Sequence, residues 1–428
     1  GMVGASEPLA AEAGLEILRA GGNAVDAAVA VGFALAVTFP EAGNLGGGGF
    51  MLIRRAEGDA LVVDYREQAP GAATRDMYLG AQGELIPDAS TVGPLAAAVP
   101  GTVAGLALAH QKFGRLKWAQ VLQPAIRLAQ DGFPVSYSLS RSLREHEEQL
   151  SKFPETRRIF LRDGRVYEPG DIFRQPDLAR TLRRIARRGP QAFYRGRIAR
   201  AIVATMKKHQ GLISGNDLEQ YQAKMREPLR ASFRSYEILS VPPPSSGGVG
   251  LIEMLNILEP LDLGAPQSFD SIRLLAETMR RAYADRAAYL GDADFAAVPA
   301  ASLTSREYAA ALRNEVVRGR AELAVQPGKP AAFESPQTTH FSVVDAEGNA
   351  VSNTYTLNDS YGCGVTVEGA GFLLNNQMDD FTAKPGAPNL FELIQSEANA
   401  IAPRKRPLSS MTPTIVVKDG KVRLVLGS

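Results

Sequence analysis

Apolar and polar residues follow two different periods along this chain. Residues 6–20 place apolar side chains every three or four positions, which predicts an amphipathic helix with Ser6 as its N-cap. Residues 23–38 are apolar on almost every side and begin with Asn23, a favourable capping residue. A helix that is apolar all round is buried, so this pattern indicates helices packed against a sheet.

Shorter apolar runs that lie between turn residues predict strands. Residues 50–55 and 60–67 form one expected hairpin, and Asp419-Gly420 is a strong two-residue turn between two later strands. The other expected strands are 235–241, 370–374, 412–418 and 422–426. Helices are expected within 95–113, over much of the chain from there to about 230, and at 249–258 and 268–290.

Two segments read as connections rather than as regular elements. Residues 322–337 contain three prolines and predict an extended linker, and residues 382–403 are polar and punctuated by Pro and Gly, which predicts a surface loop. Ser245 and Ser246 precede the helix expected at 249–258 and are placed to cap it.

Residues 337–359 predict a further hairpin with its turn over 345–349. With the turn there, Thr338 lies across the ladder from Thr356 and Asn358. Directly opposed residues in such a ladder are roughly 5 Å apart, which brings their hydroxyl groups within hydrogen-bond reach. Threonine is common in strands, so this pairing alone fits a polar sheet face as well as an active site.

Composition excludes several classes of function. The chain has 428 residues, of which 45% are hydrophobic and 22% charged, as in an ordinary globular protein. Its 47 basic and 46 acidic residues give a net charge of +1, which provides no global electrostatic case for nucleic acid or a membrane surface. The apolar run at 24–39 is too short to span a bilayer.

Cysteine and histidine usage adds two limits. Cys363 is the only cysteine, so no internal disulfide is possible, which fits a reducing compartment or a bacterial exported protein without disulfides. The four histidines and this cysteine show no metal-ligand spacing, so no metal and no cofactor is expected. The chain as it stands carries no signal peptide.

Three polar or glycine-rich segments can each be explained by a structural role alone. The glycine-rich run 43–49 lacks the Lys-Ser/Thr of a phosphate-binding loop, so close backbone packing explains it better. Arg66 ends an apolar strand and needs a partner, which by proximity is Glu67 or Asp64. Asp379-Asp380, read alone, is a solvated turn.

A threonine hydroxyl is a weak nucleophile and needs a base within hydrogen-bond reach. No Ser-His-Asp set occurs at a persuasive spacing in this chain. A threonine that becomes N-terminal by chain cleavage carries its own base, because an α-amine has an ordinary pKa of roughly 7.7–8.0.

Five separated segments, in the same order, resemble the γ-glutamyltransferases, also called glutathione hydrolases. The matching runs are 43–50, 242–248, 337–340, 375–381 and 406–411. The resemblance implies an α+β fold of four layers (αββα), the N-terminal-nucleophile (Ntn) hydrolase fold, with stacked antiparallel sheets between helices. It also implies cleavage between Gln337 and Thr338, so that residues 1–337 form a large subunit and residues 338–428 a small one, held together as a heterodimer.

The resemblance assigns roles to individual residues. Thr338 attacks the γ-amide of glutathione or a related donor, and water or an amino-acid or peptide acceptor then resolves the γ-glutamyl ester. Thr356 orients the nucleophile. The α-carboxylate is assigned to Arg66, Ser409 and Ser410, and the α-ammonium to Asn358, Gln377 and Asp380. The expected partner is thus a small-molecule substrate, and the expected location is the bacterial periplasm or outside the cell, with the cytoplasm left open.

Two departures from the family pattern bear on activity. The family follows the final Gly-Ser with Pro-Gly-Gly, whose amides form the oxyanion hole, whereas this chain ends at Ser428. One oxyanion donor is worth roughly 3 kcal/mol in the transition state. Phe391 stands where the family often has a substrate-covering tyrosine. The alternatives are therefore a cephalosporin-type or other amide acylase, or an inactive fragment that acts as a binding module.

Overall fold

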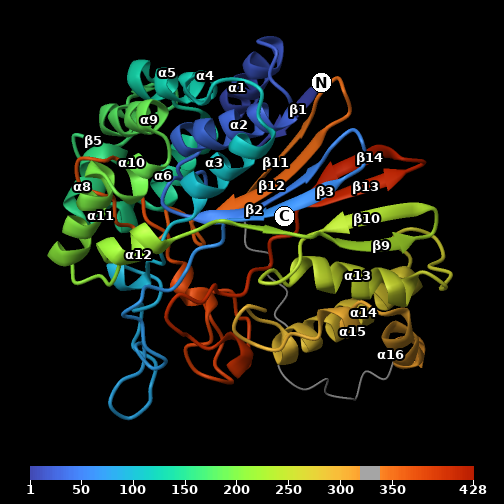
Figure 1. Cartoon of the computed structure of the whole chain (residues 1–428). Coiled ribbons are helices and arrows are strands. Elements are labelled where there is room, and N and C mark those ends of the chain that lie inside the picture. The colour runs from blue at the N-terminus through green and yellow to red at the C-terminus, as the bar shows by residue number, and fades with distance from the viewer. Residues whose placement is uncertain (319–337) are drawn as a thin grey trace.

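The computed structural model describes residues 1–318 and 338–428, and its two main sheets are antiparallel and stacked face to face. Helices cover the outer side of each sheet (Figure 1). The larger sheet has the order β1 (Met2–Ala5), β11 (Thr338–Val344), β12 (Ala350–Thr356), β2 (Gly48–Arg54), β3 (Ala60–Asp64) and β8 (Lys224–Arg226). The smaller sheet has the order β14 (Lys421–Leu426), β13 (Thr414–Lys418), β10 (Tyr236–Ser240) and β9 (Leu229–Phe233).

The helices α1 (Pro8–Arg19), α2 (Ala24–Thr38) and α3 (Thr102–Phe113) pack on the outer face of the larger sheet. All of α2 is buried, as its apolar sequence predicts, and Asn23 and Asp26 close a capping box at its start. The predicted N-cap of α1 was wrong. Glu7 caps this helix by accepting a hydrogen bond from the Leu9 amide at 2.8 Å, because the helix begins one residue later at Pro8, which favours the first helical position.

A helical lobe continues from this layer, as expected for the chain up to about residue 230 (Figure 1). Its helices are α4 (Trp118–Val121), α5 (Gln123–Asp131), α6 (Tyr137–Glu145), α7 (Glu147–Ser151), α8 (Pro154–Phe160), α9 (Pro176–Arg188), α10 (Gln191–Tyr194), α11 (Arg197–Lys208) and α12 (Gly215–Gln220). Short strands join them: β4 (Phe133–Pro134) with β7 (Ile172–Phe173), and β5 (Leu161–Arg162) with β6 (Arg165–Val166).

The smaller sheet is covered on its outer side by a second helical layer (Figure 1). Its helices are α13 (Gly247–Leu258), α14 (Phe269–Tyr289), α15 (Ala300–Leu303) and α16 (Arg306–Arg318). The core between the two sheets includes Phe50 and Leu52 from β2, Leu239 from β10 and Ile415 from β13. The chain therefore forms the four layers that the sequence predicted. Within the described part of the chain, no helix is both long and apolar enough to cross a membrane.

The predicted central hairpin is β11 and β12, and its register fixes the position of Thr338. Thr338 pairs directly with Thr356, which pairs on its other side with Gly48. Alternate residues of a strand share a face, so the side chain of Thr338 points the same way as that of Ser342. The Ser342 hydroxyl donates to the Val425 carbonyl of β14 at 2.9 Å, so this face looks toward the smaller sheet.

One other local prediction was wrong. Residues 370–374 form only isolated bridges, because Leu373 pairs with Thr366 and Leu374 pairs with Gly46 of the glycine-rich loop rather than with a strand. The segment 382–403 is the irregular, largely exposed or half-buried loop that was expected. Two of its residues, Gln395 and Asn399, are buried and donate their side-chain amides to the Asp380 carbonyl. The expected linker at 322–337 and its last residue, Gln337, lie outside the described residues.

Candidate active site

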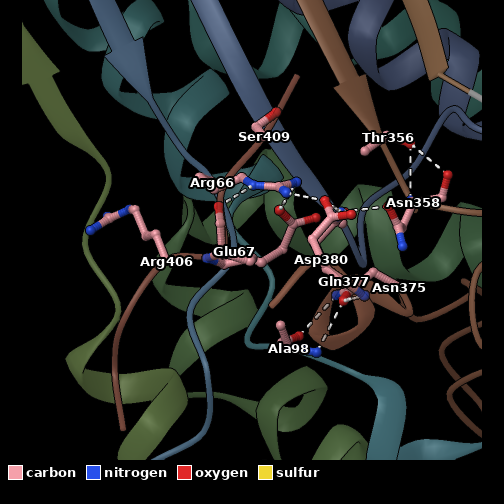
Figure 2. Close-up of polar contacts among 12 residues, drawn as sticks. Arg66, Glu67, Ala98, Thr356, Asn358, Asn375, Gln377, Asp380, Arg406 and Ser409 are labelled. Carbon is pink, nitrogen blue, oxygen red and sulfur yellow. Dashed lines mark hydrogen bonds and ion pairs between the residues drawn. The ribbon is translucent and has the colours of Figure 1, made fainter. Parts of the chain in front are cut away.

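The predicted nucleophile lies at the first position of β11, where its strand neighbours place it beside a second hydroxyl. Thr338 is half-buried, whereas Thr356 is buried. The Thr356 hydroxyl oxygen accepts a hydrogen bond from the Asn358 amide at 2.9 Å, just beyond the end of β12. Asn358 has a φ of 86°, in the left-handed region that asparagine tolerates, and this turns the chain toward the rest of the site (Figure 2).

Arg66 follows β3 and is the centre of the site (Figure 2). Its guanidinium is fully buried, pairs with Asp380 through Nη2 and reaches Glu67 at 3.3 Å through Nη1. Nε and Nη2 also donate to the carbonyls of Pro407 and Leu408, at 3.1 and 3.2 Å. Pairing with Glu67, inferred from proximity, is confirmed. Asp64 instead accepts a hydrogen bond from the backbone amide of Arg66 and forms an ion pair with Arg226.

Asp380 begins a chain of polar contacts that runs back to the threonine pair. The Gln377 side-chain amide donates to Asp380 at 2.7 Å and to the Asn358 side-chain oxygen at 2.9 Å. Asp379 and Asp380 are both buried, which excludes the solvated-turn reading. The three residues assigned to a substrate ammonium therefore form one connected set between Arg66 and Thr356.

The two predicted serine ligands lie beside this set but differ from each other. Ser409 is buried, and its hydroxyl oxygen accepts the Met411 amide at 3.1 Å. Ser410 is exposed, and its hydroxyl oxygen accepts a hydrogen bond from Arg286 of α14 at 3.2 Å. Ser246 is at the N-cap position of α13, as expected, but its side chain makes no capping hydrogen bond. Its hydroxyl instead donates to the Ser409 carbonyl at 2.8 Å and so holds this segment in place.

Glu67 was considered in the sequence only as a partner of Arg66, but it is a second buried carboxyl group of the site. Burial raises its pKa to about 7, although the positive charge of Arg66 opposes this change. Gly48 makes room for the group, since a Cβ there would lie 2.8 Å from the Glu67 carboxyl carbon. Gly48 pairs with Thr356, which pairs with Thr338, so Gly48 lies about two strand spacings, roughly 10 Å, from Thr338.

Asn375 was not predicted as a site residue, yet it braces the turn that carries Gln377 (Figure 2). Its side-chain oxygen accepts the amides of Ala98 and Gln377 at 3.0 and 2.9 Å. Its amide donates to the carbonyls of Gly46 and Ala98 at 2.7 and 2.8 Å. The only signal in the sequence was its place in the run 375–381, because its partners lie far along the chain.

Asp379 connects its own turn to two other loops. It accepts the Ser90 hydroxyl at 2.7 Å and the Leu390 amide at 2.9 Å. Burial raises its pKa to about 6. Its contact with Leu390 anchors the segment that contains Phe391, the residue expected in place of the family's tyrosine.

The arrangement suits a substrate that carries both charges of an amino acid. A fixed guanidinium binds a carboxylate, and a carboxylate with two amide oxygens binds an ammonium group. A pair of hydroxyl groups lies at one end of this set. The described residues contain no group of three or more His, Cys, Asp or Glu that could hold a metal ion.

Comparisons with known proteins identify the family of this chain. A family model described as gamma-glutamyltranspeptidase matches residues 10–428. The glutathione hydrolase proenzyme of Escherichia coli (strain K12) is 49% identical over 433 residues, which are 100% of this chain and 75% of that protein. This chain thus spans about three quarters of the length of that relative.

Two solved structures resemble most or nearly all of this chain. The gamma-glutamyltranspeptidase of Helicobacter pylori has a TM-score of 0.73 and 42% identity, covering 79% of this chain and 94% of that one. The cephalosporin acylase of Bacillus halodurans has a TM-score of 0.86 and 30% identity, covering 99% of this chain and 76% of that one. The likeness confirms the predicted Ntn-hydrolase fold with stacked sheets between helices.

Proposed function

The chain belongs to the gamma-glutamyltranspeptidase family, a family of enzymes, and we propose that Thr338 is its nucleophile and that its donors are glutathione and related γ-glutamyl amides. The observation that carries this proposal is the continuous polar set from Arg66 through Asp380, Gln377 and Asn358, which reaches the paired threonines. This polar set supports a head-group site for an amino acid, at a fixed distance from the proposed nucleophile Thr338.

The reaction begins with cleavage of the bond between Gln337 and Thr338. The new α-amine of Thr338 takes the proton of the Thr338 hydroxyl as the oxygen attacks the γ-carbonyl carbon of the donor. The carbon–nitrogen bond of the γ-amide then breaks, and the leaving amine takes that proton. Water, or the amine of an acceptor amino acid or peptide, then attacks the ester carbonyl carbon. The bond from this carbon to the Thr338 oxygen breaks, and the proton of the attacking group passes through the α-amine to that oxygen and restores the hydroxyl.

Arg66 has room for a substrate carboxylate despite its existing partners. A guanidinium has five N–H groups, and the contacts with Glu67, Asp380, Pro407 and Leu408 use four of them. One Nη1–H thus has no acceptor among the described residues. We assign this N–H, together with Ser409 and Ser410, to the α-carboxylate of the donor.

The two parts of a cleaved chain would stay together through their strands. Residues 338–428 contribute β11, β12 and β13, which pair with β1, β2 and β10 of the preceding part. We therefore propose that residues 1–337 and 338–428 form a heterodimer after cleavage. The relative from E. coli is likewise called a proenzyme. A periplasmic or extracellular location remains a prediction.

A second candidate is an amide acylase, favoured by the similarity in fold to a cephalosporin acylase. The two candidates differ in the head group of the donor. A γ-glutamyl amide carries the α-ammonium that Asp380 and Gln377 would bind, whereas a glutaryl amide of the same length does not. Buried Asp380 beside Arg66 favours the γ-glutamyl donor.

The test compares hydrolysis of γ-glutamyl-p-nitroanilide and glutaryl-p-nitroanilide by the purified protein. We expect turnover of the γ-glutamyl donor at a kcat/KM at least tenfold higher, since each lost charged hydrogen bond costs roughly 1.5–3 kcal/mol. Thr338→Ala should abolish both chain cleavage and turnover. Thr304→Ala is the matched control, because Thr304 follows α15 in the helical layer outside the smaller sheet. It should leave chain cleavage and turnover unchanged. Preference for the glutaryl donor would establish the acylase instead, and binding of L-glutamate without turnover would indicate a binding module.

A further inference from the structure

Arg286 of α14 is a second buried arginine beside the candidate site, and neither the sequence motifs nor the assigned roles include it. The residue is 7% exposed. Nε donates to the Ser246 hydroxyl at 3.0 Å and Nη2 to the Ser410 hydroxyl at 3.2 Å. Within the described part of the chain, no carboxylate forms an ion pair with it. Of the other buried arginines, Arg66 and Arg406 are each paired with an acid, whereas Arg54 donates to backbone carbonyls.

An unpaired buried cation is costly, because burial removes the water that stabilises its charge. Burial accordingly lowers the pKa of Arg286, and the negative charge of Asp380 only partly opposes this. Arg66 acts in the same direction as burial, so the two guanidinium groups repel each other. A bound anion near both groups would remove this cost.

The contacts of the two arginines enclose one short segment of backbone. Arg66 donates to the Leu408 carbonyl, and Arg286 donates to the Ser410 hydroxyl two residues later. Ser246, which Arg286 also binds, donates its hydroxyl and its amide to the Ser409 carbonyl, both at 2.8 Å. The segment 408–410 is therefore held by Arg66 at one end, and by Arg286 and Ser246 at the other.

We propose that Arg286 is a positioning residue that orients Ser410 and Ser246 and supplies a second positive charge to the site of the donor's α-carboxylate. Because its Nη2–H occupies the acceptor side of the Ser410 hydroxyl, the Ser410 proton is directed away from Arg286 and toward a ligand. Arg286 thus determines specificity for a carboxylate over an uncharged group at this position. This inference rests on the proposed function, since it assigns the same head-group site.

The test measures binding of two ligands by calorimetry. L-glutamate carries the α-carboxylate, and L-isoglutamine carries an uncharged α-carboxamide in its place, with the rest of the molecule unchanged. Arg286→Gln should weaken binding of L-glutamate roughly 10- to 100-fold, the loss expected for one charge-assisted contact, and binding of L-isoglutamine less than about threefold. Arg286→Lys, which keeps the charge but not the planar fork, should restore part of the preference.

Arg280→Gln is the matched control on the same helix, because Arg280 is partly exposed and pairs with Glu277 rather than with the site. It should leave both affinities unchanged. Equal weakening of both ligands by Arg286→Gln would mean a purely structural role and overturn the proposal, as would no change for either ligand. If Arg286→Gln does not fold, the preference ratio of Arg286→Lys decides, and an unchanged ratio overturns the proposal.

The outcomes also separate this inference from the proposed function. A wild-type protein that binds L-glutamate through Arg286 but hydrolyses no γ-glutamyl donor would retain the role of Arg286 and contradict that of Thr338. If the wild-type protein hydrolyses the donor but Arg286→Gln keeps the preference for a carboxylate, the role of Thr338 is retained and the role of Arg286 is contradicted. A wild-type protein that does not bind L-glutamate would overturn the role of Arg286.

Discussion

Replacing Glu67 with glutamine should make the stability of the protein less dependent on pH. Burial raises the pKa of Glu67 from 4.5 to about 7, so between these values the folded protein holds a proton that the unfolded chain has released. The stability that this proton provides is fully present below pH 4.5 and is lost as the pH rises through 7. Glutamine cannot release a proton and does not incur this loss.

The size of the effect follows from the difference between the two pKa values. The difference is about 2.5 pH units, and each unit corresponds to roughly 1.4 kcal/mol, so the loss at pH 8 is about 3 kcal/mol. Glu67 is fully buried, so solvent screening does not reduce this figure. Relative to wild type, Glu67→Gln should therefore gain about 3 kcal/mol of unfolding free energy between pH 4.5 and 8.

The assay is urea unfolding at matched pH values from 4.5 to 8, with both proteins carrying Thr338→Ala so that the chain stays in one piece. Glu397→Gln is a control with the opposite sign, because the hydrogen bond from Arg75 lowers the pKa of exposed Glu397. Its stability relative to wild type should fall slightly as the pH rises. A Glu67→Gln curve that runs parallel to wild type, or that falls, would refute the reasoning.

Two further predictions concern His340 and Asp380. Burial lowers the pKa of His340 to about 4. The free energy of unfolding of the wild-type protein should therefore fall by up to about 3 kcal/mol between pH 6.5 and 4. Urea unfolding should show a smaller fall for His340→Gln. Asp380→Asn removes one partner of buried Arg66 and should destabilise the protein by roughly 3–5 kcal/mol. It should also lower the pKa of Glu67, which the charge of Asp380 raises, and abolish binding of L-glutamate. A cost below about 1 kcal/mol would contradict the importance of the ion pair.

The fold could be predicted from sequence wherever one element carries its own pattern. The uninterrupted apolar run of α2, the hairpin of β11 and β12 and the turn at Asp419-Gly420 each reflect interactions between neighbours in the chain. Residues 370–374 were assigned wrongly because an apolar run does not say whether a strand lies beside it. Here the neighbour of Leu374 is Gly46, in a loop.

The candidate site divides in the same way. The resemblance assigned roles to Gln377 and Asp380 inside the matching runs and to Arg66, Thr356 and Asn358 outside them. The structure brings these five residues together. Sequence reasoning missed the residues whose role depends on distant partners. Arg286 lies 40 and 124 positions from the serines that it binds, and no periodic pattern connects them.

The central claim is that Thr338 becomes an N-terminal nucleophile, and the intact mass of the purified protein under denaturing conditions tests it most directly. We expect two chains with the masses of residues 1–337 and 338–428, and a single uncut chain for Thr338→Ala. A wild-type protein that remains one chain of 428 residues, or that is cut at any other bond, would contradict the account.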